Sequence, residues 1–162
     1  MKKVLLWGGA LVVLLAVAGA GSFAFMLYKD THYVHSDPYS RDSTGPADVL
    51  VVYYSRSGHT EGAAREVARF FDADIVRIEA PRYTLDFGGW QHAGADAGDK
   101  VTTTEITYSE VDPAAYDIVA LGAPIWLFRP APPLWTFVEE NQFDGASVLL
   151  FNTFNRRVVD EE

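Results

Sequence analysis

The stretch that most constrains the fold is residues 49–60, where an apolar segment runs directly into a loop rich in hydroxyl groups. The β-branched and aromatic run at 49–54 is typical of a strand covered on both faces. Three hydroxyl groups follow, at Ser55, Ser57 and Thr60, and an amphipathic helix is predicted to begin at Thr60. A phosphate at this point would meet hydroxyl groups, backbone N–H groups and the positive end of a helix dipole. The stretch therefore predicts a strand, a phosphate-binding loop and a helix in succession.

The hydrophobic periodicity predicts an alternation of strands and helices along the rest of the chain. A strand, a helix and a second strand within so short a span imply a right-handed βαβ unit and a parallel sheet. The predicted strands are Asp48–Tyr54, Ile75–Ala80, Tyr116–Leu121 and Ser147–Asn152, and the predicted helices are Thr60–Asp72 and Leu134–Asn141. On the first helix, Glu61 and Arg65 are four residues apart and are expected on the outer face.

The segments between these elements are predicted to be loops. Residues 81–115 form a long connection. A helix over part of 89–99 is an alternative to loop, but the glycines at 88–89 and within 93–99 argue against a long one. Within this connection, Val101–Tyr108 is rich in Thr and Ile and is a candidate for a short edge strand. Gly122–Phe128 is expected to be the loop at the carboxyl end of the third strand.

The N-terminus carries a long apolar segment. Val4 to Tyr28 contains no charge, and as a helix it would extend about 37 Å, more than a hydrocarbon core of about 30 Å. Lys2 and Lys3 precede it, whereas Lys29-Asp30 on the other flank is balanced. The positive-inside rule therefore places residue 1 in the cytoplasm and the domain outside, as a single-pass membrane protein.

A cleaved signal peptide is the alternative for residues 1–28. Ala18-Gly19-Ala20 fits a cleavage site between small residues, and the product would be secreted. Against this, the apolar run continues to Tyr28. Residues 29–47 are poor in apolar side chains and are expected to be a linker, with the domain at 48–162.

Composition excludes several classes of function. The formal net charge is -9, and proteins that bind nucleic acid usually carry a basic surface. We therefore expect no nucleic-acid partner. The chain has no cysteine, so disulfides, thiol catalysis and thiolate metal sites are excluded. His32, His35 and Asp37 lie in the polar linker and are interpreted as solvated, so no metal site is predicted.

Two motifs together resemble the flavodoxin family. Ser55-Arg56-Ser57-Gly58-His59-Thr60 resembles the family's FMN phosphate loop, and Gly122-Ala123-Pro124-Ile125-Trp126 resembles its flavin-contacting loop after the third strand. The resemblance covers about residues 47–155. It implies a three-layer, doubly wound α/β fold with a parallel sheet of order 2-1-3-4. The apolar segment before the domain adds one predicted transmembrane helix, which the resemblance does not cover. The family's fifth strand and last helix are expected to be missing, so the domain would be C-terminally incomplete and the fourth strand would form an open, apolar edge.

The resemblance also implies FMN as the cofactor and a set of residues to hold it. The hydroxyl groups of the first motif would bind the phosphate together with neighbouring backbone N–H groups, and Trp126 would lie against the isoalloxazine ring. These two loops follow the first and third strands. Ligands of open α/β sheets bind beyond the strand ends where the winding direction switches, and flavodoxin, with FMN between these two strands, is itself the standard example of that rule. The predicted cofactor-binding residues are Ser55, Arg56, Ser57, Gly58, His59, Thr60, Pro124, Ile125, Trp126, Leu127, Phe128 and Thr153.

The function implied is electron transfer by a membrane-anchored FMN protein. It would act as a carrier for a redox partner protein, or as an FMN-dependent oxidoreductase toward NAD(P)H or a quinone. The alternative is a truncated, non-catalytic remnant that holds no flavin and serves as an interaction module. A phosphate-accepting receiver domain of similar topology is excluded, because it needs an aspartate where Gly122 follows the third strand.

Overall fold

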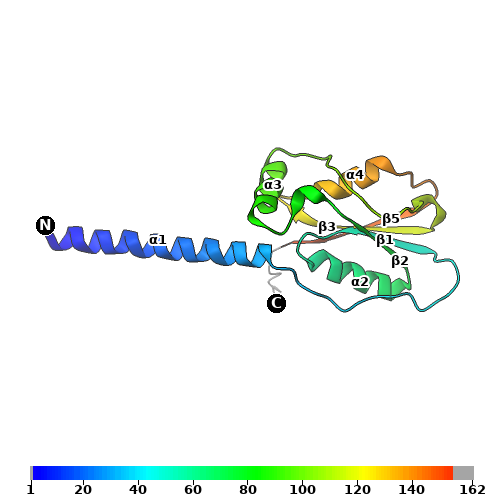
Figure 1. Ribbon diagram of the computed structural model, residues 1–162, viewed down its shortest axis with the longest axis horizontal. Coiled ribbons are helices and arrows are strands. Elements are labelled where there is room, and N and C mark those ends of the chain that lie inside the picture. Colours follow the sequence, from blue (N-terminus) through cyan, green and yellow to red (C-terminus); the bar gives the residue numbers. More distant parts are fainter. Residues whose placement is uncertain (1, 155–162) are drawn as a thin grey trace, which may run out of the picture.

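The computed structural model describes residues 2–154, and the side chains of residues 13–154. Its first element is helix α1 (Lys2–Thr31), which extends away from the folded domain (Figure 1). Residues Val13–Thr31 of this helix are long and apolar enough to cross a membrane. The expected apolar N-terminal helix is thus present, a form that suits both an anchor and a signal peptide.

The domain is built on a twisted sheet with β1 (Val49–Tyr54) near its centre. β1 pairs in parallel with β2 (Asp74–Ile78) on one side and with β3 (Ile118–Trp126) on the other. β3 in turn pairs in parallel with β5 (Ser147–Thr153). The predicted order 2-1-3-4 is confirmed, with β5 as the fourth parallel strand.

The described part of the sheet nevertheless contains a fifth strand, so the expectation of four was wrong. This strand is β4 (Arg129–Pro130), which is antiparallel to the end of β3. Its pairing extends β3 as far as Trp126, so most of the predicted loop 122–128 is strand and only residues 127–128 form the turn. Gly122 lies inside β3, and a Cβ there would sit 2.1 Å from the Phe151 ring of β5.

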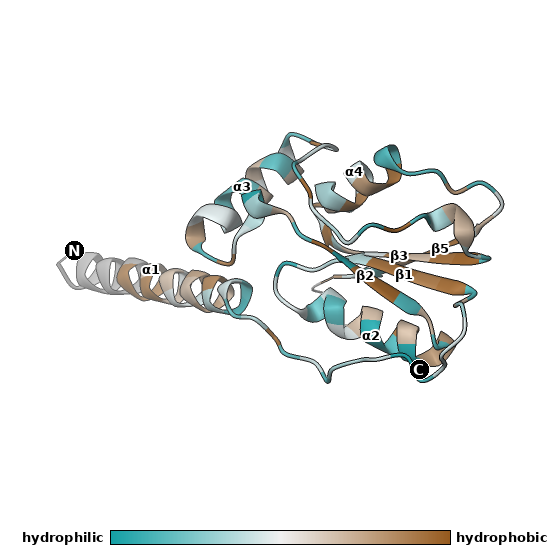
Figure 2. Cartoon of the chain, turned by 45° about the vertical axis from the view of Figure 1, so that its right-hand side comes forward, coloured by the Kyte–Doolittle hydropathy of each residue, from teal (hydrophilic) through white to brown (hydrophobic). Residues whose placement is uncertain are grey.

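Helices cover both faces of the sheet (Figures 1 and 2). α2 (His59–Phe71) lies on one face, and α3 (Phe87–Gly98) and α4 (Pro132–Glu140) lie on the other. Alternate residues of β1 serve the two layers. Val51 packs in one buried cluster with Ala64 and Ala68 of α2, whereas Val52 packs in a second cluster with Phe137 of α4. The expected three-layer α/β fold is confirmed.

The connection at 81–115 differs from its predicted form. It contains a short 3-10 turn, η1 (Pro81–Tyr83), then α3, and later a second turn, η2 (Pro113–Ala115). The glycine-rich segment is therefore a helix of 12 residues. The edge strand expected at Val101–Tyr108 reduces to one bridge, in which Glu79 and Thr107 exchange backbone hydrogen bonds of 2.8 and 2.9 Å.

The segment between α1 and β1 is not a free tether. We call residues 32–48 the strap, because they run along α2 (Figure 1). The Tyr39 hydroxyl donates to the Ala73 carbonyl at 2.8 Å, and Arg65 of α2 donates to the Ser36 carbonyl at 2.8 Å. The strap is therefore bound to the domain along its length.

The outer side of β5 is an open edge within the described residues. Val148, Leu149 and Leu150 are 50, 43 and 65% exposed. The predicted open, apolar fourth strand is thus present in this part of the chain.

Candidate functional site

A cavity of about 460 Å³ lies at the carboxyl edge of the sheet. β2 and β3 lie on opposite sides of β1, so the winding direction reverses between β1 and β3, and ligands of open α/β sheets bind beyond the strand ends at such a point. The residues that line the cavity are Lys29, Asp30, Ser55, Arg56, Ser57, His59, Thr60, Pro124, Ile125, Trp126, Thr153 and Phe154.

One wall of the cavity is the loop that joins β1 to α2. The Gly58 N–H donates to the Ser55 hydroxyl at 3.1 Å, which closes the loop. Gly58 has φ 88° and is followed at once by His59, the first residue of α2. The first turn of that helix therefore presents its N–H groups and its positive dipole end at the cavity, an arrangement suited to a phosphate.

The strap crosses this loop at Gly58. The Val34 N–H donates to the Ser57 carbonyl at 2.9 Å. A Cβ at Gly58 would lie 2.0 Å from the Val34 carbonyl oxygen. Glycine is needed at this position for the positive φ and for the close approach of the strap.

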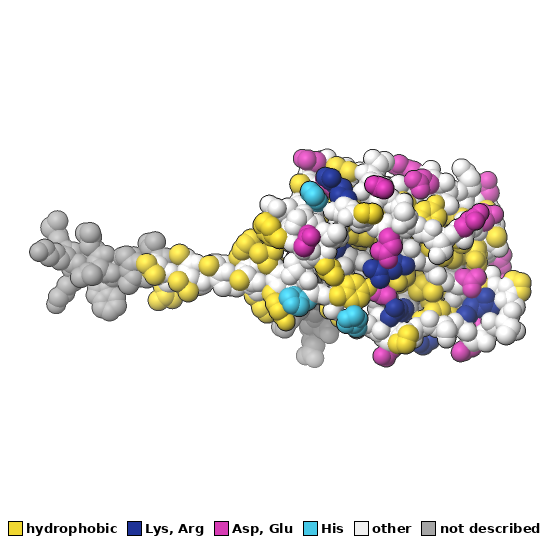
Figure 3. Space-filling model, viewed as in Figure 1, with side chains coloured by type: hydrophobic (Ala, Val, Ile, Leu, Met, Phe, Trp, Pro, Cys, Tyr) yellow, Lys and Arg dark blue, Asp and Glu magenta, His cyan; other side chains and the backbone are white. Residues whose placement is uncertain are grey.

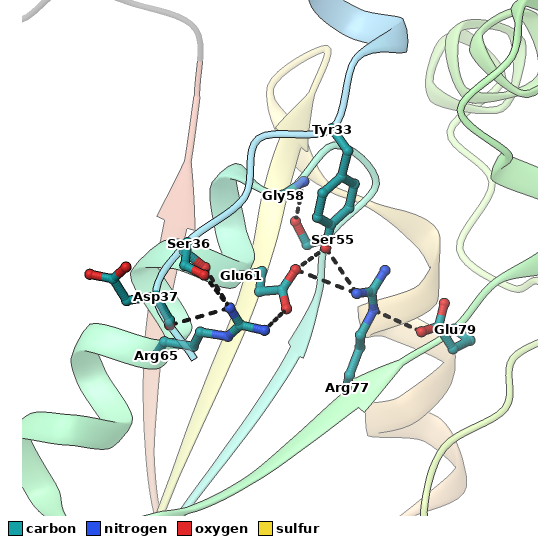
Figure 4. Close-up of polar contacts among 9 residues, drawn as sticks. All are labelled: Tyr33, Ser36, Asp37, Ser55, Gly58, Glu61, Arg65, Arg77 and Glu79. Carbon is teal, nitrogen blue, oxygen red and sulfur yellow. Dashed lines mark hydrogen bonds and ion pairs between the residues drawn. The ribbon is translucent and has the colours of Figure 1, made fainter. Parts of the chain in front are cut away.

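An ion network around the buried Glu61 holds the strap against α2 (Figure 4). The Glu61 carboxylate is bound by the Tyr33 hydroxyl of the strap, by Arg65 and, at 3.4 Å, by Arg77. Arg77 also donates to the Tyr33 hydroxyl at 2.9 Å and pairs with Glu79 at 2.8 Å. The predicted pair between Glu61 and Arg65 forms. The prediction that Glu61 lies on the exposed outer face was wrong, because the strap covers this side chain and leaves it 4% exposed.

The opposite wall of the cavity carries Trp126. Its indole packs edge to face against Tyr54, with ring centres 5.8 Å apart, and against Tyr83 at 5.0 Å. Both tyrosines are buried, and burial raises the pKa of each hydroxyl, to about 12 for Tyr83. The two tyrosines thus pack against the indole, which lies beside the cavity.

The end of β5 closes the cavity between these walls. The hydroxyl groups of Thr60 and Thr153 lie 2.7 Å apart and form a hydrogen bond. Thr153 pairs with Pro124 across the sheet. The ends of β1, β3 and β5 therefore meet at one site, as the order of the strands predicts.

Arg56 links the loop to α1 and to the segment before α3. Its guanidinium donates to the carbonyls of Asp30 at 2.8 Å, Thr84 at 3.1 Å and Asp86 at 3.2 Å. Burial lowers the pKa of Arg56, and these carbonyls replace the lost water. The side chain is thus engaged with backbone, so only the Arg56 N–H remains to serve a phosphate, as expected from the sequence.

Nine of the twelve predicted site residues line this cavity. The other three, Gly58, Leu127 and Phe128, do not; Gly58 shapes the loop, whereas Leu127 and Phe128 form the turn between β3 and β4. As cofactor contacts, all twelve stay a prediction. The sequence did not predict Lys29 and Asp30 as cavity residues, because only the tertiary placement of α1 brings them here, and Phe154 is a further lining residue outside the predicted set. Among the described residues no cluster suited to a metal ion occurs.

A second cavity, of about 760 Å³, lies between α3 and residues 101–105. Its carboxylate at Asp96 is already satisfied by the Arg82 guanidinium at 2.6 and 3.0 Å and by the Tyr83 hydroxyl at 2.9 Å. These bonds, chiefly those from Arg82, lower the pKa of Asp96. The cluster holds α3 against η1, and the cavity lies away from the point where the winding reverses.

Comparison with known proteins agrees with this geometry. The family model for flavodoxin matches residues 48–161. The chain belongs to the flavodoxin family. Among curated proteins none matches it at a significant level.

Solved structures share the fold of this flavodoxin domain. A putative flavoprotein from Bacteroides uniformis is 26% identical with a TM-score of 0.62, over 70% of this chain and 76% of that one. A putative flavoprotein from Bacteroides eggerthii is 25% identical with a TM-score of 0.58, over 69% and 74%. A Lactobacillus acidophilus flavoprotein crystallised in complex with FMN is 18% identical with a TM-score of 0.52, over 67% and 93%.

Proposed function

We propose that the cavity between β1 and β3 binds FMN, with the phosphate on the loop at 55–60 and the ring system beside Trp126. The observation that carries this proposal is that one cavity joins a helix N-terminus rich in N–H and hydroxyl donors to a fixed indole. Its volume of about 460 Å³ falls in the range of about 300–1,000 Å³ found for small-molecule sites. The FMN complex of the Lactobacillus acidophilus flavoprotein, a protein of the same fold, supports the same cofactor.

The residues present suit a phosphate dianion. Several N–H dipoles, such as those of Arg56 and His59, which both line the cavity, share the charge, so no lysine is required. The Ser55 and Thr60 hydroxyls already take part in hydrogen bonds that shape the site, whereas the Ser57 hydroxyl has no partner among the described residues. We assign Ser57 as the side chain whose hydroxyl donates a hydrogen bond to the phosphate.

The protein would function in electron transfer. When bound, the flavin supplies one- and two-electron chemistry, and the chain binds, orients and partly shields it. The electron partner would be a redox protein, NAD(P)H or a quinone, with the chain acting as carrier or as oxidoreductase. We further propose that α1 anchors the domain in a membrane with the N-terminus in the cytoplasm, a topology supported by Lys2 and Lys3.

The direct test is a titration of the full chain, in detergent micelles, with FMN. Binding is expected to quench flavin fluorescence and to shift the flavin absorption bands. Ser57→Ala is expected to weaken binding about 10- to 100-fold, because a hydrogen bond to a charged group contributes about 1.5–3 kcal/mol. Ser109→Ala, at an exposed position of the connection before β3, is the matched control and should bind as the parent does.

The second candidate is a flavin-free interaction module, which the exposed apolar edge of β5 favours. A cooperatively folded chain that leaves FMN fluorescence unchanged would support it and contradict the flavoprotein assignment.

Mass spectrometry of the mature protein distinguishes a membrane anchor from a cleaved signal peptide, because signal cleavage after Ala20 would remove most of α1.

A further inference from the structure

The turn between β3 and β4 has an unusual composition for its shape. Leu127 and Phe128 form a two-residue hairpin turn with φ angles of 42° and 71°. Turns in which both central residues have positive φ strongly prefer Asn-Gly or Asp-Gly, because side chains such as Leu and Phe are strained there. Leu127 is 60% exposed and Phe128 is 97% exposed. In water, this tip is unfavourable both for its backbone and for its side chains.

Further exposed apolar side chains lie at the same edge of the domain. Phe154 follows β5 and lines the cavity, and Phe87 begins α3 and stacks on Trp90. Phe154 is 57% exposed and Phe87 is 50% exposed. The tip and Phe154 follow the carboxyl ends of the parallel strands β3 and β5. Phe87 lies at the same edge, because the carbonyl of its neighbour Asp86 accepts a hydrogen bond of 3.2 Å from Arg56 in the loop after β1. We call Phe87, Leu127, Phe128 and Phe154 the apolar rim; Figure 3 shows hydrophobic side chains gathered where α1 meets the domain.

The end of α1 is fixed against this same edge. The Phe23 ring packs on Trp90 with ring centres 5.9 Å apart, and the Trp90 indole N–H donates to Asp30 at 3.3 Å. Arg56 donates to the Asp30 carbonyl at 2.8 Å, and the strap then binds along α2. The helix therefore passes into the domain without a flexible joint.

These contacts fix how deep the rim would sit. Phe23 precedes Tyr28, the last residue of the uncharged segment, by about 7.5 Å along the helix at about 1.5 Å per residue. Trp90, which contacts Phe23, is thus level with the last turns of the apolar segment. Aromatic side chains are enriched at that depth, and interfacial helices bury their apolar faces about 5–10 Å into it.

We propose that the apolar rim docks on the bilayer that α1 spans and that the cofactor cavity consequently opens at the lipid surface. The proposal rests on the membrane-anchor interpretation of α1 given above. The occupant is lipid rather than a protein partner, because a spanning α1 brings this edge to the membrane before any partner arrives. The lipid surface accounts for the strained Leu-Phe tip, since buried apolar side chains offset the cost of the turn.

The absence of native cysteine allows single labelled positions to test this. The full chain in lipid nanodiscs is labelled at Phe128→Cys with an environment-sensitive fluorophore, and nitroxide lipids serve as quenchers. The matched control is Phe70→Cys, 83% exposed near the end of α2 and hence at the opposite edge of the sheet. A third label at Val17→Cys reports whether α1 is in the bilayer.

We expect a blue-shifted, strongly quenched signal at position 128 and an unquenched signal at position 70. Equal quenching at 70 and 128, or none at 128 while position 17 is quenched, would overturn the docking. An unquenched position 17 would instead refute the anchor, and with it this proposal, while a parallel FMN titration would still report on the cofactor site.

A second variant guards against an effect of the label. Leu127→Asn with Phe128→Gly supplies the residues that the turn prefers while removing both apolar side chains. A label at Phe87→Cys is expected to lose at least half of its quenching in this background. Unchanged quenching there would show that the tip does not hold the domain to lipid.

Discussion

Gly58 is the residue on which the phosphate loop and the strap both depend. Its φ is +88°, and a Cβ would lie 2.0 Å from the Val34 carbonyl oxygen. Gly58→Ala is expected to lower the free energy of unfolding by about 1–2 kcal/mol from the left-handed backbone alone, and by more because the strap must move. FMN binding should weaken in parallel, as measured by chemical denaturation and fluorescence titration.

Gly94→Ala is the control for this change. It lies within α3, and a Cβ there meets nothing within 4 Å. The substitution should raise the free energy of unfolding by about 1 kcal/mol through helix propensity and leave FMN affinity unaltered. Similar losses at both glycines would mean that neither the turn nor the strap contact matters.

At the hairpin tip between β3 and β4, substitution is expected to raise the free energy of unfolding, in contrast to Gly58→Ala. Two non-glycine residues at positive φ cost roughly 1–3 kcal/mol each. Leu127→Asn lowers this cost, because Asn tolerates the left-handed region, and Phe128→Gly removes it. In detergent micelles the double variant should therefore be more stable to urea than the parent chain. Phe70→Asn, which removes an exposed apolar side chain without a strained turn, should change the free energy of unfolding by less than about 0.5 kcal/mol. A destabilised double variant would contradict the strain.

At the scale of elements, α3 illustrates where local signals fail. Its glycines argued against a long helix, yet Asp86 caps a helix of 12 residues by accepting from the Gly89 N–H at 2.8 Å. Gly89 is packed so closely on Thr84 that a Cβ would lie 2.0 Å from its carbonyl oxygen. The Asp96 cluster then holds the helix to η1. Tertiary contacts that no sequence window reveals offset the low helix propensity.

The Asp96 cluster makes stability sensitive to acid. Hydrogen bonds, first from Arg82 and then from Tyr83, lower the pKa of Asp96 in the folded state. The carboxylate therefore stabilises the fold above the ordinary aspartate pKa of about 3.9, and this contribution is lost as the pH falls below about 4. Asp96→Asn should be less stable at pH 7 and should lose less stability between pH 5 and 3, measured by urea denaturation. The variant Asp144→Asn, at an exposed position, should show the same dependence of stability on pH as the parent chain. If Asp96→Asn lost as much stability as the parent between pH 5 and 3, the stabilising role of the Asp96 carboxylate would be contradicted.

At the scale of the whole molecule, the two edges of the sheet in the described chain are unlike. β2 forms one edge, whereas β5 presents the exposed Val148, Leu149 and Leu150 at the other. Unpaired, apolar edge strands associate with other chains. We expect the purified chain to self-associate with concentration in light scattering, and Leu150→Lys to reduce this at least several-fold. Val138→Lys, at a half-exposed site on α4, is the control; equal effects would point to net charge rather than to the edge.

The sequence by itself determined the α/β class, the order of the parallel strands and the identity of most cavity residues. The class follows from the periodicity of strands and helices, which is a local pattern. The order of the strands and the cavity residues followed from the resemblance of two short motifs to the flavodoxin family. Only the tertiary structure decided that Lys29 and Asp30 join the cavity, that the strap buries Glu61, and that Leu127 and Phe128 form a strained tip. Each of these depends on contacts between segments far apart in the chain, and the free energy of such contacts appears in no local pattern of residues.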